Sequence, residues 1–313
     1  MILSIAGLIV GIIMLLAGAE LFVKGASGIS RYFKIPEYAV GATVVAIGTS
    51  LPEFITSTYA SITGHPQISV SNVIGSNIFN IAFVMGASAI IQPIHLTRNL
   101  FQKDAPMLIA SLLLLFGLAF DGMFGRFDGL LLTLVFISYL WFLMQERDEH
   151  LVDQPMDGYL PTSKLKAVLM VIAGGFLLFI GSKLAVDSGN SIARAFGIKE
   201  WFIGATAIAA GTGLPEFLTS IVAVIRRRRG IAVGNVIGSN IINIVGVIGA
   251  ASLAAPIPVN MTNIYFDFSY LFLLSLMFIF MVSDKEITRE AGILLIAAYI
   301  VYIQGIFHIS YIK

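Results

Sequence analysis

The sequence predicts an all-α membrane protein of ten transmembrane helices, arranged as two five-helix repeats of inverted topology. Three observations predict this fold: the composition, the series of apolar blocks and an internal repeat. The 313 residues are 58% hydrophobic and only 12% charged, whereas a soluble domain is roughly 45–50% apolar and about 25% charged. One soluble core cannot bury so much apolar surface, so we expect the chain to lie in a bilayer.

Composition also excludes several classes of function. The chain has no cysteine, which removes disulfides and thiolate metal sites. A net charge of +1 without a long basic face argues against binding to nucleic acid. Residues 1–25 lack a basic leader and a small-residue cleavage site, so they predict a first transmembrane helix and not a removable signal.

Ten apolar blocks are each long enough to span a membrane, which takes about 20 residues. They cover residues 3–30, 38–62, 69–94, 105–121, 127–145, 166–193, 201–225, 231–256, 264–283 and 288–309. We therefore divide the chain into a first five-helix repeat (1–145), a cytoplasmic linker (146–163) and a second five-helix repeat (164–313).

Basic residues predict the orientation of these helices. The loops after the odd-numbered blocks hold 14 of the 19 Lys and Arg residues. Because cytoplasmic loops are enriched in positive charge, the odd-numbered loops are expected inside and both termini outside. We interpret the run Arg226–Arg229 as a topology anchor of this kind.

The sequence contains an internal repeat at a constant offset. AIGTSLPEFITS (46–57) matches AAGTGLPEFLTS (209–220) at an offset of 163 residues. At the same offset, VSNVIGSNIFNI (70–81) and VGNVIGSNIINI (233–244) agree at 10 of 12 positions. The motif regions are thus 41–81 and 204–244. An odd number of helices per half inverts the second copy, and such repeats carry substrate sites on interrupted helices near the bilayer midplane. We expect both GT(S/G)LPE segments to be interrupted.

The repeated residues bring oxygen atoms to membrane depth. Pro52 and Pro215 remove the hydrogen bonds of the Gly48 and Gly211 carbonyls, and bare carbonyls are tolerated there only where they line a polar cavity. The residue after each proline is a glutamate. Small polar side chains also recur at a spacing of four residues, on one helix face in each copy: Asn72, Ser76, Asn80 and Asn235, Ser239, Asn243.

These groups are carboxylates, hydroxyls, amides and carbonyls, which suit a hard cation such as Ca²⁺, Na⁺ or Mg²⁺. A partly unwound cage favours Ca²⁺, since Mg²⁺ demands a tight octahedron. Two simpler interpretations compete. Ser50 and Glu53 fit a helix capping box, although Gly213 stands where the second copy would need its serine. The Ser/Asn stripes, above all Asn72 and Asn235, fit hydrogen bonds between helices.

At these motifs the chain resembles the sodium/calcium exchangers of the calcium/cation antiporter superfamily, in particular their short prokaryotic, archaeal-type members. Four segments correspond to the two α-repeats of the family: GTSLPE (48–53), GTGLPE (211–216), SNVIGSNIFN (71–80) and GNVIGSNIIN (234–243). The resemblance implies a monomeric antiporter of the cell membrane, not an enzyme and without a cofactor. It would exchange about three Na⁺ for one Ca²⁺ by alternating access, with Sr²⁺ or H⁺ as further candidate ions.

The resemblance also implies which residues bind the transported ions. Ca²⁺ would be held by two carboxylates and two carbonyls, from Glu53, Glu216, Thr49 and Thr212. Na⁺ would use the same glutamates and threonines, with Ser50, Ser76, Ser239 and the carbonyls of Ala46 and Ala209. Asn80 and Asn243 would complete the cluster. The sequence departs from the family at Gly213, which lacks the usual serine hydroxyl, and at Asn243, an aspartate in the potassium-dependent branch.

Three other functions stay open on the residues alone. A Ca²⁺/H⁺ antiporter on the same fold would use a glutamate whose pKa is raised by desolvation, but the GNxxE-type motif of such proteins is absent. A passive cation channel fits inverted repeats less well than a carrier does. An intramembrane hydrolase would need a nucleophile and a base that no motif supplies.

Overall fold

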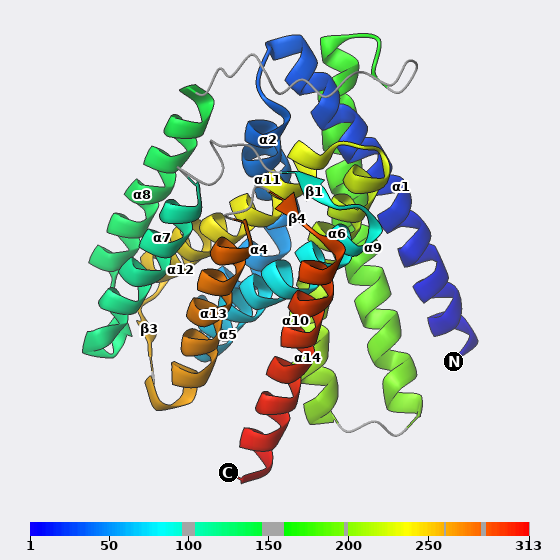
Figure 1. Cartoon of the computed structure of the whole chain (residues 1–313). Coiled ribbons are helices and arrows are strands. Elements are labelled where there is room, and N and C mark those ends of the chain that lie inside the picture. Colours follow the sequence, from blue (N-terminus) through cyan, green and yellow to red (C-terminus); the bar gives the residue numbers. More distant parts are fainter. Residues whose placement is uncertain (96–103, 146–159, 197–199, 260, 283–285, 313) are drawn as a thin grey trace. The chain divides into compact units, whose positions relative to one another are not determined.

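The computed structural model describes residues 1–95, 104–145, 160–196, 200–259, 261–282 and 286–312. Most of the predicted linker, residues 146–159, lies outside this part of the chain. The first half contains α1 (Ile2–Phe33), α2 (Glu37–Val40), η1 (Gly41–Val45), α3 (Ala46–Thr49), α4 (Leu51–Ile62), α5 (Pro66–Ile78), η2 (Phe79–Val84), α6 (Met85–Ile91), β1 (Ile94–His95), α7 (Ala105–Leu118), η4 (Ala119–Asp121), β2 (Met123–Phe124) and α8 (Arg126–Gln145) (Figure 1).

The second half contains the corresponding elements. They are α9 (Lys164–Ala195), α10 (Glu200–Ile225), α11 (Arg229–Ile241), η5 (Ile242–Val247), α12 (Ile248–Ala254), β3 (Ile257–Pro258), α13 (Met261–Val282), β4 (Glu286–Ile287) and α14 (Arg289–Ile312). Each of the ten apolar blocks falls on helical segments, and η1, η2 and η5 are π-helical turns inside longer helices. Six helices of the described residues are long and apolar enough to cross a membrane, or seven if the bent pair 37–49 and 51–62 counts as one span.

Polar and apolar side chains are distributed as expected for a protein in lipid. Large apolar side chains are exposed on the long helices, among them Leu134 and Trp141 of α8 and Phe176 of α9. Carboxylates and amides are buried instead, including Glu53 and Glu216. Because an ionisable group in hydrocarbon is costly, such groups face the protein interior. The chain is an all-helical, multi-pass membrane protein.

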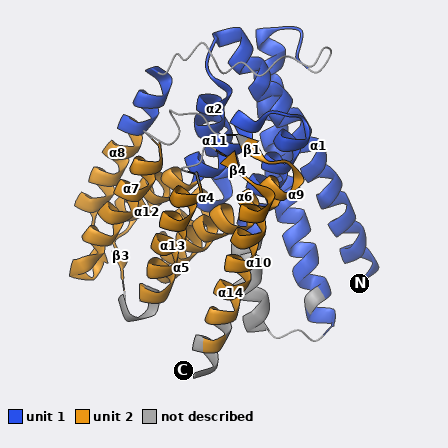
Figure 2. Cartoon of the chain, in the orientation of Figure 1, with its two compact units in different colours: residues 1–53, 138–239 blue, residues 54–137, 240–313 orange. Residues whose placement is uncertain are grey.

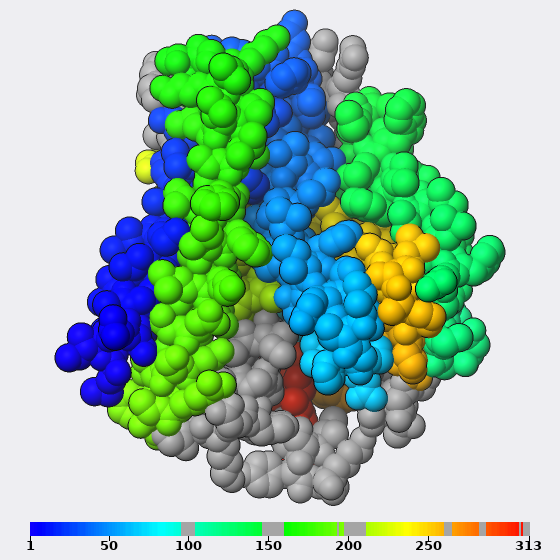
Figure 3. Space-filling view, turned by 180° about the vertical axis from the view of Figure 1, so that it is seen from behind, coloured from blue at the N-terminus to red at the C-terminus, as the bar shows by residue number. Residues whose placement is uncertain are grey.

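The chain forms two compact units, and each unit draws on both sequence halves (Figure 2). Unit 1 is residues 1–53 and 138–239, and unit 2 is residues 54–137 and 240–313. In unit 1, α1 packs along α9 through glycines that let the backbones approach. A Cβ added at Gly18 would lie 2.9 Å from the Leu178 nitrogen, and one at Gly181 would lie 3.0 Å from the Gly11 carbonyl oxygen. Figure 3 shows these two helices side by side.

Unit 2 contains contacts that are related to each other by the repeat. Adding 163 to the first-half residue of one contact gives the second-half residue of the other. Strand β1 pairs antiparallel with β4, with Ile94 opposite Ile287, and β2 pairs with β3, with Phe124 opposite Ile257. Adding 163 to Ile94 and Phe124 gives Ile257 and Ile287. The repeat of elements and contacts therefore continues beyond the two sequence motifs into the fifth helix of each half, where a glycine of α6 meets one of α14 and a glycine of α8 meets one of α12.

Candidate cation-binding site

The first GTSLPE motif is interrupted, as the sequence predicts. Helix α3 ends at Thr49, Ser50 takes non-helical angles (φ −81°, ψ 6°), and the helices before and after it are bent by 47°. Pro52 lacks an N–H group, so the helix cannot complete its hydrogen bonds across this point. The break leaves Thr49, Ser50 and Glu53 within one turn of each other, all of them buried.

The second motif differs, and the prediction of an interruption there is wrong. Helix α10 runs unbroken through Pro215. The carbonyl that Pro215 cannot pair, that of Gly211, accepts a 2.6 Å hydrogen bond from the Ser182 hydroxyl on the neighbouring α9. The repeat mate of Ser182 is Ala19, which has no hydroxyl. A donor from another helix thus accompanies the continuous second motif.

Both motif glutamates are fully buried, with 0% of their surface exposed. Within unit 1, Ser50 Oγ donates a 3.0 Å hydrogen bond to Glu216 Oε1. Glu216 Oε2 is buried and has no hydrogen-bond partner among the described residues. Gly213, the repeat mate of Ser50, has no hydroxyl to offer to Glu53 in return. A buried carboxylate oxygen without a donor is costly unless a cation or a proton neutralises it.

Thr49, Asn235 and Ser239 line up beside Glu216 in the same unit. Thr49 Oγ1 donates to Asn235 Oδ1 at 2.9 Å and lies 3.5 Å from Ser239 Oγ. Asn235 Nδ2 in turn contacts Ser220 Oγ at 2.9 Å and the Glu216 carbonyl oxygen at 3.2 Å. This asparagine therefore uses its amide to join α10 and α11.

Unit 2 holds the repeat mate of that joint. Asn72 Nδ2 of α5 donates to Ser57 Oγ of α4 at 3.1 Å, and Ser57 Oγ contacts the Ser69 carbonyl oxygen at 3.3 Å. The interpretation of Asn72 and Asn235 as hydrogen-bonding links between helices is confirmed. Their serine partners, Ser57 and Ser220, were not singled out, although both belong to the repeated PEF(I/L)TS segment.

Further amides gather elsewhere in unit 2. Asn243 Nδ2 donates to Asn77 Oδ1 at 3.1 Å, and Asn77 Nδ2 donates to the Asn240 carbonyl oxygen at 3.0 Å. Asn80 is fully buried, and neither atom of its amide has a hydrogen-bond partner in the described part of the chain. Both Asn80 and Asn243 are the second residue of a π-helical turn, a feature that frequently marks functional sites. Ser76 is equally buried.

Four of the predicted positions enter through their backbone or lie in the unbroken second motif. The Ala46 carbonyl accepts the Ser50 N–H at 3.0 Å and lies 3.4 Å from Thr49 Oγ1. Thr212 and Gly213 lie in the continuous α10. Ala209 lies there too, and its side chain is outside the described residues.

We expect Ser182→Ala to destabilise the protein, because the Gly211 carbonyl would lose its donor while staying buried. Leaving such a group unsatisfied costs about 1–3 kcal/mol, which thermal unfolding in detergent would detect as a lower Tm. Ser182→Thr keeps the hydroxyl and serves as the control. Equal Tm values for Ser182→Ala and the wild type would show that the bond contributes nothing to the second motif.

Comparison with known proteins gives a consistent assignment. The profile of the family described as sodium/calcium exchanger protein matches residues 3–145 and 166–307. The chain is 37% identical to membrane protein MJ0091 of Methanocaldococcus jannaschii over 98% of this chain and 99% of the relative. It is 33% identical to inner membrane protein YrbG of Escherichia coli, over 99% and 98% respectively.

A solved structure is similar over nearly the whole fold. The sodium–calcium exchanger NCX_Mj, soaked with Na⁺ and Ca²⁺ in work on extracellular ion exchange, matches with a TM-score of 0.85 and 36% identity. The match covers 97% of this chain and 98% of the other. The same exchanger has also been soaked with Na⁺ and Sr²⁺.

Proposed function

The chain belongs to the sodium/calcium exchanger family, and we propose that it exchanges Na⁺ for Ca²⁺ across the cell membrane by alternating access. It is a cation exchanger of this family and not an enzyme. The observation that carries the finer proposal is the pair of repeat-related carboxylates Glu53 and Glu216, both fully buried in a membrane protein. Two carboxylates offset the charge of one Ca²⁺, and the Glu216 oxygen without a donor is open to a cation.

The proposed ligands all offer oxygen. For Ca²⁺ they are the carboxylates of Glu53 and Glu216 with the carbonyls of Thr49 and Thr212. For Na⁺ the same carboxylates and threonines act with Ser50, Ser76, Ser239, Asn80, Asn243 and the carbonyls of Ala46 and Ala209. Because the two ions share the glutamates, occupancy by one excludes the other, as obligatory exchange requires. Exchange of about three Na⁺ per Ca²⁺ would move net charge.

The topology belongs to the same proposal. We propose ten spans, two inverted five-helix repeats and both termini outside. The support is the offset of 163 residues, which relates the strands and interhelical contacts as well as the motifs, together with the bias of basic residues toward odd-numbered loops. A monomer suffices for this mechanism, since both repeats lie in one chain.

The test is ⁴⁵Ca²⁺ flux into proteoliposomes with Na⁺, K⁺ and proton gradients imposed one at a time. We expect an outward Na⁺ gradient alone to drive uptake, and Sr²⁺ to compete with Ca²⁺. An inside-negative potential clamped with valinomycin should slow uptake in exchange for more than two Na⁺, because the cycle then carries positive charge outward. Uptake driven by a pH gradient without Na⁺ would instead identify a Ca²⁺/H⁺ antiporter.

A further inference from the structure

The turn between α10 and α11, residues 226–228, joins two other helices of unit 1 by ion pairs. Arg226 presents its guanidinium side-on to Glu20 of α1, with Nη2–Oε1 at 2.9 Å and Nε–Oε2 at 3.0 Å. Two parallel bonds of this kind fix orientation as well as distance. The side chains are partly exposed, by 43% and 35%. Water can therefore replace either partner.

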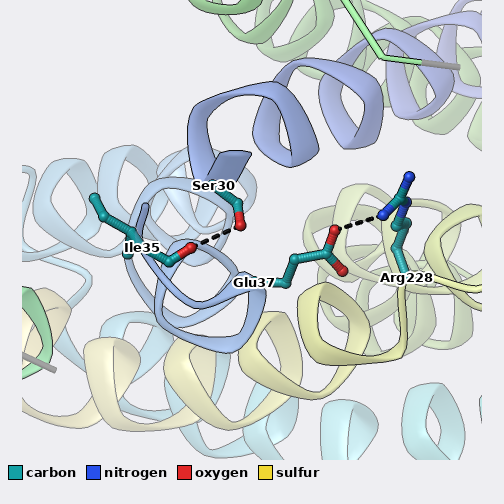
Figure 4. A network of polar contacts seen from close by, with 4 residues as sticks. All are labelled: Ser30, Ile35, Glu37 and Arg228. Carbon is teal, nitrogen blue, oxygen red and sulfur yellow. Dashed lines mark hydrogen bonds and ion pairs between the residues drawn. The ribbon is translucent and has the colours of Figure 1, made fainter. Parts of the chain in front are cut away.

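The second pair of the turn is buried. Arg228 Nη1 contacts Glu37 Oε1 of α2 at 2.9 Å, and the side chains are only 4% and 5% exposed. Figure 4 shows this pair with Ser30, whose hydroxyl donates to the Ile35 carbonyl oxygen at 2.6 Å in the connection between α1 and α2. Separating a buried pair leaves an uncompensated charge and is strongly unfavourable. The Arg228–Glu37 pair is thus a fixed brace, whereas the Arg226–Glu20 pair is able to open.

The same turn occurs in the first repeat without these charges. Arg227 has a left-handed φ of 58°, and its repeat mate Gly64 has a φ of 82°. The N–H of Arg228 bonds the Ala223 carbonyl at 2.7 Å, as the N–H of His65 bonds that of Ala60 at 2.8 Å. The backbone is repeated, yet the mates of Arg226 and Glu20 are Thr63 and Lys183. No ion pair can form between threonine and lysine.

We propose that Arg226 and Arg228, with Glu20 and Glu37, form an arginine clasp that biases the exchanger toward one of its two access states. This inference rests on the proposed function and on the predicted cytoplasmic location of the turn. Arg228 fixes the turn to α2, and Arg226 holds α1 to the turn. The glycine-lined contact between α1 and α9 has no interlocking side chains at Gly11, Gly18 and Gly181. Displacement of α1 past α10 therefore has to break the Arg226–Glu20 pair.

Because the repeat mates Thr63 and Lys183 cannot form an ion pair, the effect is one-sided. In a carrier built from repeats, alternating access moves one repeat or bundle against the other around a fixed site. The Arg226–Glu20 contact has no repeat-related counterpart, so it stabilises one access state and no equivalent contact stabilises the other. The clasp holds α1 as it lies in this structure, so its loss increases the population in which α1 has moved away from α10 at the cytoplasmic end.

The natural absence of cysteine allows a direct test. Ser27 is a buried residue of α1, two turns beyond Glu20. We would introduce Ser27→Cys alone and with Glu20→Gln, Arg226→Gln or the charge swap Glu20→Arg/Arg226→Glu. The measurement is the labelling rate by an impermeant maleimide applied from the cytoplasmic side. Exposed ion pairs contribute little individually, so we expect an increase of about two- to fivefold in either single variant and a return toward the parent rate in the swap.

Arg227→Gln is the matched control, since it removes one positive charge from the same turn outside the two ion pairs. High salt should raise the labelling of the parent but not of Glu20→Gln, because it screens the intact pair. Unchanged labelling in Glu20→Gln, or an equal increase in Arg227→Gln, would overturn the clasp. Labelling does not depend on which ion drives exchange. A protein that fails to use Na⁺ but shows the labelling pattern would refute the proposed function and leave the clasp intact.

Discussion

Glu53→Gln and Glu216→Gln are each expected to reduce Na⁺-driven ⁴⁵Ca²⁺ uptake by roughly 100-fold or more. Glutamine preserves the size of the side chain and one oxygen but removes the charge. Both glutamates are fully buried, so the charge of a bound Ca²⁺ would lose half of its compensation in a site without bulk water. Removing one partner of a buried charge pair costs about 3–5 kcal/mol, and each 1.4 kcal/mol is a factor of ten.

The matched control is Glu290→Gln, which neutralises an exposed carboxylate at the start of α14 and should leave uptake unchanged. Elution as a single species in size-exclusion chromatography would separate a transport defect from misfolding. Retention of more than about a tenth of wild-type uptake in either glutamate variant would exclude that carboxylate from the transport site.

The two glutamates are not equivalent, although the sequence repeats them. Ser50 donates a hydrogen bond to Glu216, whereas Gly213 has no side chain with which to donate to Glu53. The first motif is bent at Ser50, whereas the second lies in a continuous helix, with Ser182 bonded to its freed carbonyl. The Ser50 hydroxyl of the first motif has no counterpart at Gly213 in the second. Conversely, the Ser182 hydroxyl of α9 has no counterpart at Ala19 of α1. Two-fold symmetry at the level of the motif therefore does not give two identical half-sites.

The sequence was informative where a local rule or the repeat decides the structure. Ten apolar blocks and an exact offset identify the helices and the repeated segments, and Pro52 accounts for the break beside Thr49. The sequence was uninformative where a contact depends on a side chain far away in the chain. The freed Gly211 carbonyl of α10 is bonded by Ser182, 29 residues before it, and Arg226 is paired with Glu20, 206 residues away. The π-helical turns at Asn80 and Asn243 were not predicted, because no local sequence rule separates a π-helical turn from the α-helix around it.

Gly238→Ala is expected to be one of the most damaging single-methyl substitutions in unit 1. A Cβ at this position would lie 2.6 Å from both the Cα and the carbonyl oxygen of Ala42. These are backbone atoms of η1, so no side-chain rotation relieves the overlap, and α11 has to move away from η1. Overpacking of this kind costs typically about 1–3 kcal/mol and occasionally more. In a chain of this size we expect Tm to fall by roughly 2–5 °C.

The same displacement would reach the candidate site, because Asn235 and Ser239 lie on α11 within bonding distance of Thr49. Apparent affinity for Ca²⁺ should therefore fall together with Tm. Gly189→Ala is the control: it lies inside α9, and its added Cβ would meet no atom within 4 Å. There the change should be neutral or stabilising by up to about 1 kcal/mol, since alanine favours helix over glycine. A wild-type Tm in Gly238→Ala would mean that α11 and η1 do not pack this closely, and a reduced Tm with unchanged Ca²⁺ affinity would separate the packing from the site.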